Sequence, residues 1–348
     1  MPHYSGSPLL VDRRSFLRLS ALGAGALTLG SSALALTGCA PGGSGSGAGG
    51  GAVPFTTKLG WIPDVAYAGL FIAKQDGLFT KAGLDVTIQP GGPNSPVVPL
   101  VSTGKLDVGL ESIPENVASA IKNGVKLRIV GAGLRKSPEC WISRADNPIK
   151  TPKDIEGKKL GSTLSGQNLM IEFMKRNGVD TSKVTFVPTQ FDPAPLAVGE
   201  VDALLGFVSN QPVALKNKGI DTYSMPTADF GLNRMQQVFF VTQETLDDKE
   251  KRARAKAFLL AAREGTKKML DDHKAAAELT VKLYGKEVGL NVKDQTANLD
   301  ALAPFVAGDD PSELFLMSDK LIAETIDSLD LIGVKADKSL FTNELLES

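Results

Sequence analysis

From residue 56 to residue 242 the chain alternates short apolar runs with amphipathic stretches, and this alternation constrains the fold more than any other feature. Helices are predicted between most of the apolar runs, at residues 67–75, 114–122 and 165–177 among others. Strand–helix alternation predicts parallel sheets with helices on their faces. The predicted strands are residues 58–62, 84–89, 106–110, 126–130, 159–162, 184–187, 201–207 and 238–242.

The alternation divides into two units, followed by a mostly helical C-terminal part. Residues 141–143 and 238–242 read as strands where the chain leaves and re-enters the first unit. Two crossings favour a hinged α/β protein that holds its ligand between two lobes, each a parallel-rich sheet flanked by helices. We predict lobe 1 at residues 53–142 plus 239–348 and lobe 2 at residues 143–238. The predicted C-terminal helices are residues 249–270, 274–284, 292–301 and 312–329.

The first 52 residues indicate export and attachment rather than fold. Arg13 and Arg14 precede an apolar pair, as in a twin-arginine export signal, and an apolar run of small residues follows at 19–36. The run ends Leu36-Thr37-Gly38-Cys39, which resembles a bacterial lipobox. We expect residues 1–38 to be a lipoprotein signal peptide, Cys39 to carry the lipid, and residues 39–52 to be a flexible linker. The alternatives are a membrane-spanning helix at 19–36 and export by general secretion.

Composition excludes several classes of function. The formal net charge of the chain is −1, and no basic stripe with interleaved aromatic residues appears, so no nucleic-acid partner is expected. The cysteines are Cys39 and Cys140, and the histidines are His3 and His273. A zinc site built from cysteine and histidine, or a triad that needs several histidines, is therefore excluded from the mature chain, and no metal is expected.

Ligands of parallel sheets bind beyond the carboxyl ends of the strands, and this rule selects candidate contacts. Glu111 is the sharpest polar candidate, because an acid there would accept N–H groups of a heterocycle and repel a sulfonate or nitrate. It could instead be a solvated loop carboxylate. The candidate ligand contacts are Trp61, Asp64, Tyr67, Glu111, Ser112, Trp141, Ser165, Gln167, Asn168, Phe207, Asn210 and Arg234.

Each candidate also has a plain structural interpretation. The two tryptophans could stack on an aromatic ligand or anchor the core or hinge, and Tyr67 could equally belong to the first turn of a packed helix. Ser165, Gln167 and Asn168 could present hydroxyl, amide and helix N-terminal N–H groups to an anion, or Ser165 could simply cap the helix. Arg234 could clamp a carboxylate or support its loop.

The segment Gly60-Trp61-Ile62-Pro63-Asp64, continued through residues 67–74, 77–79 and 83–86, resembles the opening of a known family. The family is the ABC-importer solute-binding proteins of the thiamine-pyrimidine-precursor and nitrate/sulfonate/taurine group. Further matches occur at residues 100–109, 195–203 and 229–231. The resemblance implies a periplasmic-binding-protein-like fold of type II, capture of a small solute by lobe closure, and delivery to a membrane permease.

Together these features predict a monomeric, lipid-anchored binding protein on the extracytoplasmic face of the cell membrane. The expected ligand is a small aromatic heterocycle such as a thiamine pyrimidine precursor or a riboflavin-like vitamin. The alternative ligand is a small organic anion such as an alkanesulfonate, taurine or nitrate. Some relatives are yeast-type pyrimidine synthases that consume a histidine and a bound pyridoxal phosphate. They carry a cysteine-rich motif that this chain lacks, so neither an enzyme nor a cofactor is expected.

Overall fold

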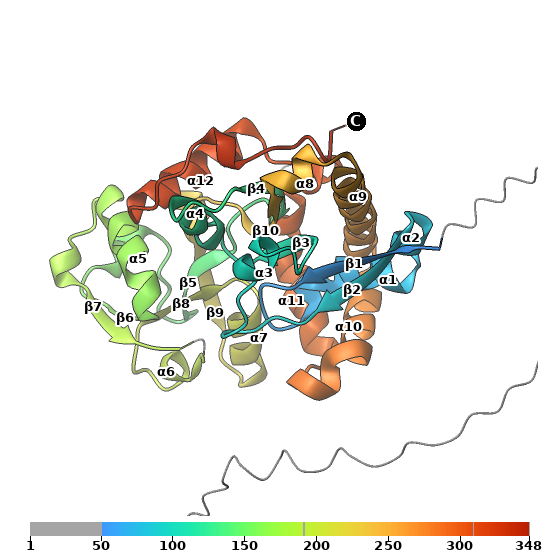
Figure 1. The fold of residues 1–348 in the computed structure, drawn as a ribbon. Coiled ribbons are helices and arrows are strands. Elements are labelled where there is room, and N and C mark those ends of the chain that lie inside the picture. The colour runs from blue at the N-terminus through green and yellow to red at the C-terminus, as the bar shows by residue number, and fades with distance from the viewer. Residues whose placement is uncertain (1–50, 191, 309, 348) are drawn as a thin grey trace, which may run out of the picture. The chain divides into compact units, whose positions relative to one another are not determined.

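A computed structural model describes residues 51–190, 192–308 and 310–347 of the chain (Figure 1). Two five-stranded sheets form its framework, and helices cover both of them. This arrangement confirms the predicted α/β architecture. The predicted export signal at Arg13 and Arg14 and the predicted lipidation site at Cys39 lie outside the described residues.

The first sheet has the strand order β2-β1-β3-β10-β4. Its parallel strands β2, β1 and β3 are joined by β10, which runs antiparallel to both β3 and β4. The carboxyl ends of β1 and β3 therefore lie at the same edge as the beginning of β10. The strands span Val53–Lys58 (β1), Leu84–Gln89 (β2), Val108–Glu111 (β3), Leu127–Leu134 (β4) and Gln236–Thr242 (β10).

The second sheet repeats this plan in the order β7-β6-β8-β5-β9. Here β5 is the antiparallel strand, paired with β8 and β9, so its first residue lies at the carboxyl edge of the parallel strands. The strands span Glu139–Arg144 (β5), Lys159–Ser162 (β6), Thr185–Pro188 (β7), Ala203–Phe207 (β8) and Thr222–Pro226 (β9).

In each sheet the antiparallel strand comes from a part of the chain that has just passed over from the other sheet. β5 follows β4 but pairs in the second sheet, and β10 follows β9 but pairs in the first. The crossings are therefore residues 135–138 and 227–235, and each strand lies whole in one sheet. The lobe limits at 142/143 and 238/239 remain a prediction from sequence, a few residues beyond these crossings. "First lobe" and "second lobe" below mean each sheet with its covering helices.

Apolar side chains fill both faces of each sheet. In the first lobe the largest cluster packs the sheet against α1, α9, α10 and α11, and Phe258 of α9 stacks between Phe55 and Phe79 at 4.9 and 5.2 Å. A second cluster packs the other face against α3, α4 and α12. The helices that cover the first sheet, with the short helices α2 and α8 beside them, span Ala68–Gln75 (α1), Leu78–Lys81 (α2), Val98–Ser102 (α3), Pro114–Lys122 (α4), Gln243–Asp247 (α8), Lys249–Asp271 (α9), His273–Val288 (α10), Val292–Ala307 (α11) and Asp319–Leu331 (α12).

Helices α1 and α9 approach each other through glycine. A Cβ on Gly265 would lie 2.1 Å from the carbonyl oxygen of Gly69, and a Cβ on Gly69 would meet Thr266. This contact fixes α1, and with it the loop that precedes α1, on the first sheet. The helices of the second lobe, Leu164–Arg176 (α5), Ala194–Ala197 (α6) and Asn210–Asn217 (α7), cover both faces of the second sheet.

Helix α12 connects the lobes. Its apolar residues pack on the first sheet, while Leu331 and the following Ile332 contact the core of the second lobe. Figure 1 shows α12 lying above β4 and α4 and reaching toward α5, and Arg176 of α5 forms an ion pair with Asp327 of α12. Among the described residues, no helix has the length and apolar character needed to cross a membrane.

Two predicted elements differ markedly from the structure, and one strand was not predicted. The first strand lies at Val53–Lys58, so Trp61 and Ile62 belong to the following loop rather than to a strand. The predicted helix 312–329 is a short 3-10 turn, Pro311–Glu313, followed by α12. Between them Phe315 takes a left-handed backbone (φ 70°) and bridges Ala132. Strand β9 was not predicted, because it is a polar edge strand that ends in Pro226.

Candidate functional site

Three loops meet at the carboxyl edge of the first sheet, and glycines allow them to do so. A Cβ on Gly60 would lie 2.6 Å from the backbone nitrogen of Ser112, after β3. A Cβ on Gly91, after β2, would lie 2.1 Å from the Leu59 carbonyl oxygen and 2.6 Å from that of Trp61. The loop that carries Trp61 is therefore held between its two neighbours by backbone contacts, which leave the Trp61 side chain half-buried at this edge.

Asp64 ends this loop and begins the next turn. Its Oδ1 accepts from the backbone nitrogen of Ala66 at 2.9 Å, while Gln295 of α11 accepts from Val65 at 2.8 Å. Burial raises the pKa of Asp64 to about 6, although hydrogen bonds from Ala66 and from the Asn210 side chain oppose the rise. Since Asn210 begins α7 of the second lobe, this carboxyl group joins the two lobes.

The buried Tyr67 hydroxyl interacts with several polar groups of the site. Burial raises its pKa most, and the negative charges of Asp64 and Glu111 raise it further. Hydrogen bonds with the Ser112 side chain and the Trp61 backbone act in the opposite direction. Tyr67 also borders a cavity of about 20 Å³, the size of one water molecule, together with Gln237.

Glu111 is the last residue of β3 and is only 6% exposed. Its Oε1 accepts from the Ser112 nitrogen at 3.0 Å and from Asn116 Nδ2 at 3.1 Å. Burial raises its pKa, and these two hydrogen bonds limit the rise. Gln237 donates its backbone N–H to the Ser112 carbonyl oxygen at 2.9 Å from a left-handed backbone (φ 49°), a conformation that non-glycine residues seldom adopt.

The structure thus brings six predicted contacts together in one cluster at this edge. Five come from the first lobe and one, Asn210, from the second. Burial raises the pKa of the Asp64 and Glu111 carboxyl groups and keeps the Tyr67 hydroxyl protonated, so the cluster offers both hydrogen-bond acceptors and a donor. The six residues are Trp61, Asp64, Tyr67, Glu111, Ser112 and Asn210.

Replacing Asp64 with asparagine should increase stability near neutral pH. The raised folded-state pKa means that the contribution of Asp64 to stability is complete below pH 3.8 and is lost as the pH rises through about 6. For this half-buried group we expect Asp64→Asn to gain about 1–2 kcal/mol at pH 7 and nothing at acidic pH. Urea unfolding at several pH values measures this gain. An equal difference from wild type at every pH would contradict the assignment.

Arg234 lies in a second network where the lobes join. Its side chain is buried, with an exposed fraction of 4%, and it forms ion pairs with Glu115 and with Glu139, the latter at 2.8 Å. Burial lowers the pKa of Arg234 to about 10. The guanidinium therefore already binds two carboxylates of its own chain, which differs from the predicted clamp on a ligand carboxylate.

The candidates of the second lobe lie at the corresponding edge of the second sheet. Helix α5 begins directly after β6, and its N-cap is Thr163, so the alternative in which Ser165 caps the helix is wrong. Gln167 is half-buried and Asn168 is exposed in the first turns of α5. Phe207, half-buried, ends β8, and its backbone nitrogen donates to Gln211.

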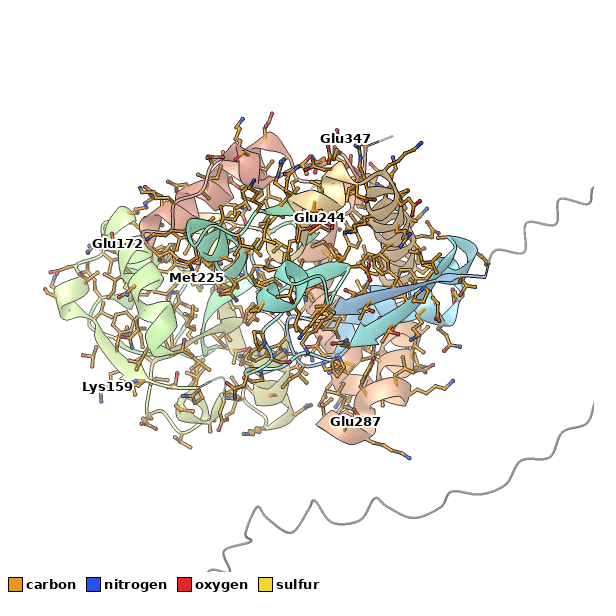
Figure 2. All side chains as sticks on the ribbon, in the orientation of Figure 1. Lys159, Glu172, Met225, Glu244, Glu287 and Glu347 are labelled. Atoms are coloured by element: carbon orange, nitrogen blue, oxygen red, sulfur yellow. The ribbon has the colours of Figure 1, made fainter. Side chains whose placement is uncertain are left out.

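The structure contradicts the prediction that Trp141 contacts a ligand. Its side chain is completely buried in the core of the second lobe, on the sheet face that packs against α5. It pairs across the sheet with Leu205 and with Met225, and Figure 2 labels Met225 within this lobe. Because β5 runs antiparallel, the residue of β5 at the ligand edge is Glu139, and Trp141 lies two residues deeper. Trp141 therefore offers no surface to a ligand.

Sequence reasoning missed Glu139 and Gln236, the first residues of the two antiparallel strands. Gln236 Nε2 donates to Ser137 Oγ at 3.3 Å, and the Ser137 backbone nitrogen donates to Asn233 Oδ1 at 3.0 Å, so these residues connect the two crossings. A glutamate at the start of the apolar run Glu139-Cys140-Trp141-Ile142 was the available signal. Within the described part of the chain, no cluster of three or more His, Cys, Asp or Glu side chains could hold a metal ion.

Residues 64–276, more than half of the chain, match the family model described as NMT1/THI5 like. The chain belongs to the NMT1/THI5-like family. It is similar to the formylaminopyrimidine-binding protein of Halalkalibacterium halodurans (23% identical over 219 residues, 62% of this chain). It is also similar to the 4-amino-5-hydroxymethyl-2-methylpyrimidine phosphate synthase of Schizosaccharomyces pombe (25% over 231 residues, 62% of this chain). The matched region spans 66% of each relative's own length.

Solved structures establish the fold of this NMT1/THI5-like chain. The periplasmic aliphatic sulphonate binding protein of Escherichia coli superposes with a TM-score of 0.61 at 18% identity. The match covers 80% of this chain and 91% of that one. The predicted periplasmic-binding-protein-like fold, with its helical C-terminal part, is thereby confirmed.

Proposed function

We propose that this protein is the extracytoplasmic solute-binding subunit of an ABC importer and that it captures a small aromatic heterocycle of the formylaminopyrimidine class between its lobes. The observation that carries the proposal is the cluster at the edge of the first sheet. There a half-buried indole, Trp61, shares a loop with Asp64, and the buried Glu111 ends strand β3, whose following loop Gly60 approaches. An indole stacks on flat rings, and carboxyl groups pair with ring nitrogens and amino groups.

The electrostatics of the cluster support a heterocycle over an organic anion. Two carboxyl groups, Asp64 and Glu111, face the same tyrosine, and both would repel a sulfonate or nitrate. The cation that an anion would need, Arg234, is bound to Glu115 and Glu139. The N-terminal turn of α5 is the remaining feature that favours an anion. The similarity to a formylaminopyrimidine-binding protein agrees with the choice of a heterocycle.

The site also suits closure on its ligand. Asp64 of the first lobe interacts with Asn210 of the second, and nearby Asn217 of α7 donates to Asp294 of α11 at 2.7 Å. A ligand at this edge would touch both lobes and favour the closed state through its extra contacts there. We further propose that the lipid on Cys39 and the linker at 39–52 keep the domain at the membrane beside its permease.

Formylaminopyrimidine should quench the intrinsic fluorescence of the protein, and the quenching should come from Trp61. The chain has two tryptophans, and the buried Trp141 serves as the matched control. We expect Trp141→Phe to retain the quenching and Trp61→Phe to lose it and to bind more weakly, because the stacking surface changes. Titration of both variants with formylaminopyrimidine and with taurine measures this. Quenching retained in Trp61→Phe, or a response to taurine alone, would refute the proposal.

A synthase activity is the second candidate, favoured by the similarity to the S. pombe enzyme. His273, at the start of α10, bonds to Asp300 of α11 through Nδ1 at 2.6 Å, and so lies against a helix of the first lobe. Incubation with pyridoxal phosphate and iron tests this candidate. Pyrimidine product that is formed by wild type and lost in His273→Ala would establish an enzyme and overturn a binding-only function.

A further inference from the structure

Two buried charged side chains, Glu115 and Arg234, and the largely buried Glu139, whose side chain is 15% exposed, lie where the two lobes join. Glu115 comes from the first turn of α4 in the first lobe, and Glu139 is the first residue of β5 in the second sheet. Arg234, from the second crossing, donates through Nη1 to Glu115 and through Nη2 to Glu139. One guanidinium thus bridges an acid from each lobe.

The charges of this cluster do not balance. Two carboxylates surround one cation, and Oε2 of Glu115, Oε2 of Glu139 and Nε of Arg234 are buried without a hydrogen-bond partner in the described part of the chain. A buried carboxylate that lacks a full counter-charge and leaves one oxygen without a hydrogen bond is costly. A proton on one carboxyl group removes the excess charge.

We propose that the Glu115–Arg234–Glu139 cluster couples closure of the lobes to the uptake of one proton, so that the protein closes more readily as the pH falls. Opening moves α4 away from β5 and admits water, and each hydrated carboxylate then remains ionised. Closing places both acids under one guanidinium in a dry environment, where the neutral form of one acid is favoured. The coupling follows from the difference in bound protons between the two states.

The titration of the surrounding groups agrees with this coupling. Burial raises the pKa of Glu139 to about 7, and a hydrogen bond with Gln236 opposes the rise. A guanidinium shared with Glu115 cannot fully offset that burial. Strands β8, β9 and β10 contribute uncharged neighbours, Phe207, Pro226 and Gln236. The other titratable groups near the cluster are Cys140, whose pKa burial raises, Glu324 bonded to Asn233, and the pair Lys136–Asp229.

The coupling concerns lobe closure alone, so it can be tested without a ligand. Lys159 of the second lobe and Glu287 of the first are both exposed, and Figure 2 marks both. Nitroxide spin labels attached to Lys159→Cys and Glu287→Cys report the distance between the lobes. Cys140 is completely buried and should not react, and the full-length chain carries Cys39→Ser throughout. Double electron–electron resonance between about pH 6 and 8.5 then gives the distance distribution, and from it the ratio of closed to open molecules.

We expect this ratio to rise on acidification by at most about tenfold per pH unit, as one linked proton allows. Glu139→Gln should hold the closed fraction high and independent of pH, since its side chain imitates the protonated acid. Glu115→Gln removes the same excess charge and should act alike, which covers the case that Glu139→Gln does not fold. The matched control Asp229→Asn removes an exposed acid of the same hinge and should titrate as wild type. A flat wild-type profile, or folded glutamine variants that titrate as wild type does, would overturn the proposal.

Discussion

Replacing Arg234 with methionine should destabilise the folded protein by about 3–5 kcal/mol at pH 7, because the change leaves two buried carboxylates without their cation. Guanidinium chloride unfolding followed by circular dichroism measures the loss. The loss should shrink as the pH falls, since Glu115 and Glu139 then take up protons and no longer need the guanidinium. Simultaneous replacement of all three residues, by glutamine, methionine and glutamine, should recover most of the stability.

The chain offers a matched control for this experiment. Arg176 of α5 pairs with Asp327 of α12, so this pair also connects the lobes, but its two side chains are about half exposed, at 43% and 52%. Arg176→Met should therefore cost no more than about 1 kcal/mol. If Arg234→Met cost as little as Arg176→Met, the buried cluster would not bear the charge imbalance that the hinge proposal requires.

The two-lobed architecture could be predicted because it follows from local pattern. Continuous apolar runs such as residues 203–207 and 238–241 indicate buried strands, and their alternation with helices leaves few arrangements. The carboxyl-edge rule then located the main cluster, since Trp61, Asp64 and Glu111 follow strands whose direction the alternation indicates.

The errors arose where strand direction or long-range contact decides the outcome. Trp141 was placed at the ligand edge on the basis of its position near a crossing. The antiparallel sense of β5, visible only in its pairing with β8 and β9, puts Glu139 there instead. The same reversal in β10 brings Gln236 to the edge. No local sequence pattern indicates that a strand will pair antiparallel in the other sheet.

The Glu115–Arg234–Glu139 cluster could not be predicted for the same reason. Glu115, Glu139 and Arg234 are separated by up to 119 residues in sequence, and of the three only Arg234 was predicted to contact a ligand. Only the crossing of β5 and β10 between the sheets brings them into contact.

Replacing Gly91 with alanine should displace the Trp61 loop and weaken ligand binding more than any other single methyl group at the site. A Cβ there would lie 2.1 Å from the Leu59 carbonyl oxygen, and 2.6 and 2.7 Å from the carbonyl oxygen and nitrogen of Trp61. All three atoms are backbone, so no side chain can rotate away to make room. We expect a loss of about 1–3 kcal/mol in stability. Affinity for formylaminopyrimidine should fall at least about tenfold, equivalent to 1.4 kcal/mol.

A buried glycine of the same sheet separates this steric effect from a general intolerance of alanine. Gly131 lies within β4, and a Cβ on it would approach no atom closer than 3.4 Å, an ordinary contact. Gly131→Ala should therefore leave affinity unchanged and stability nearly so. In a Trp141→Phe background the emission of Trp61 alone reports its environment, and it should shift in Gly91→Ala before any ligand is added. An unshifted spectrum with unchanged affinity would show that the loop has another way to accommodate the methyl group, and that Trp61 is not held by its neighbours as the structure indicates.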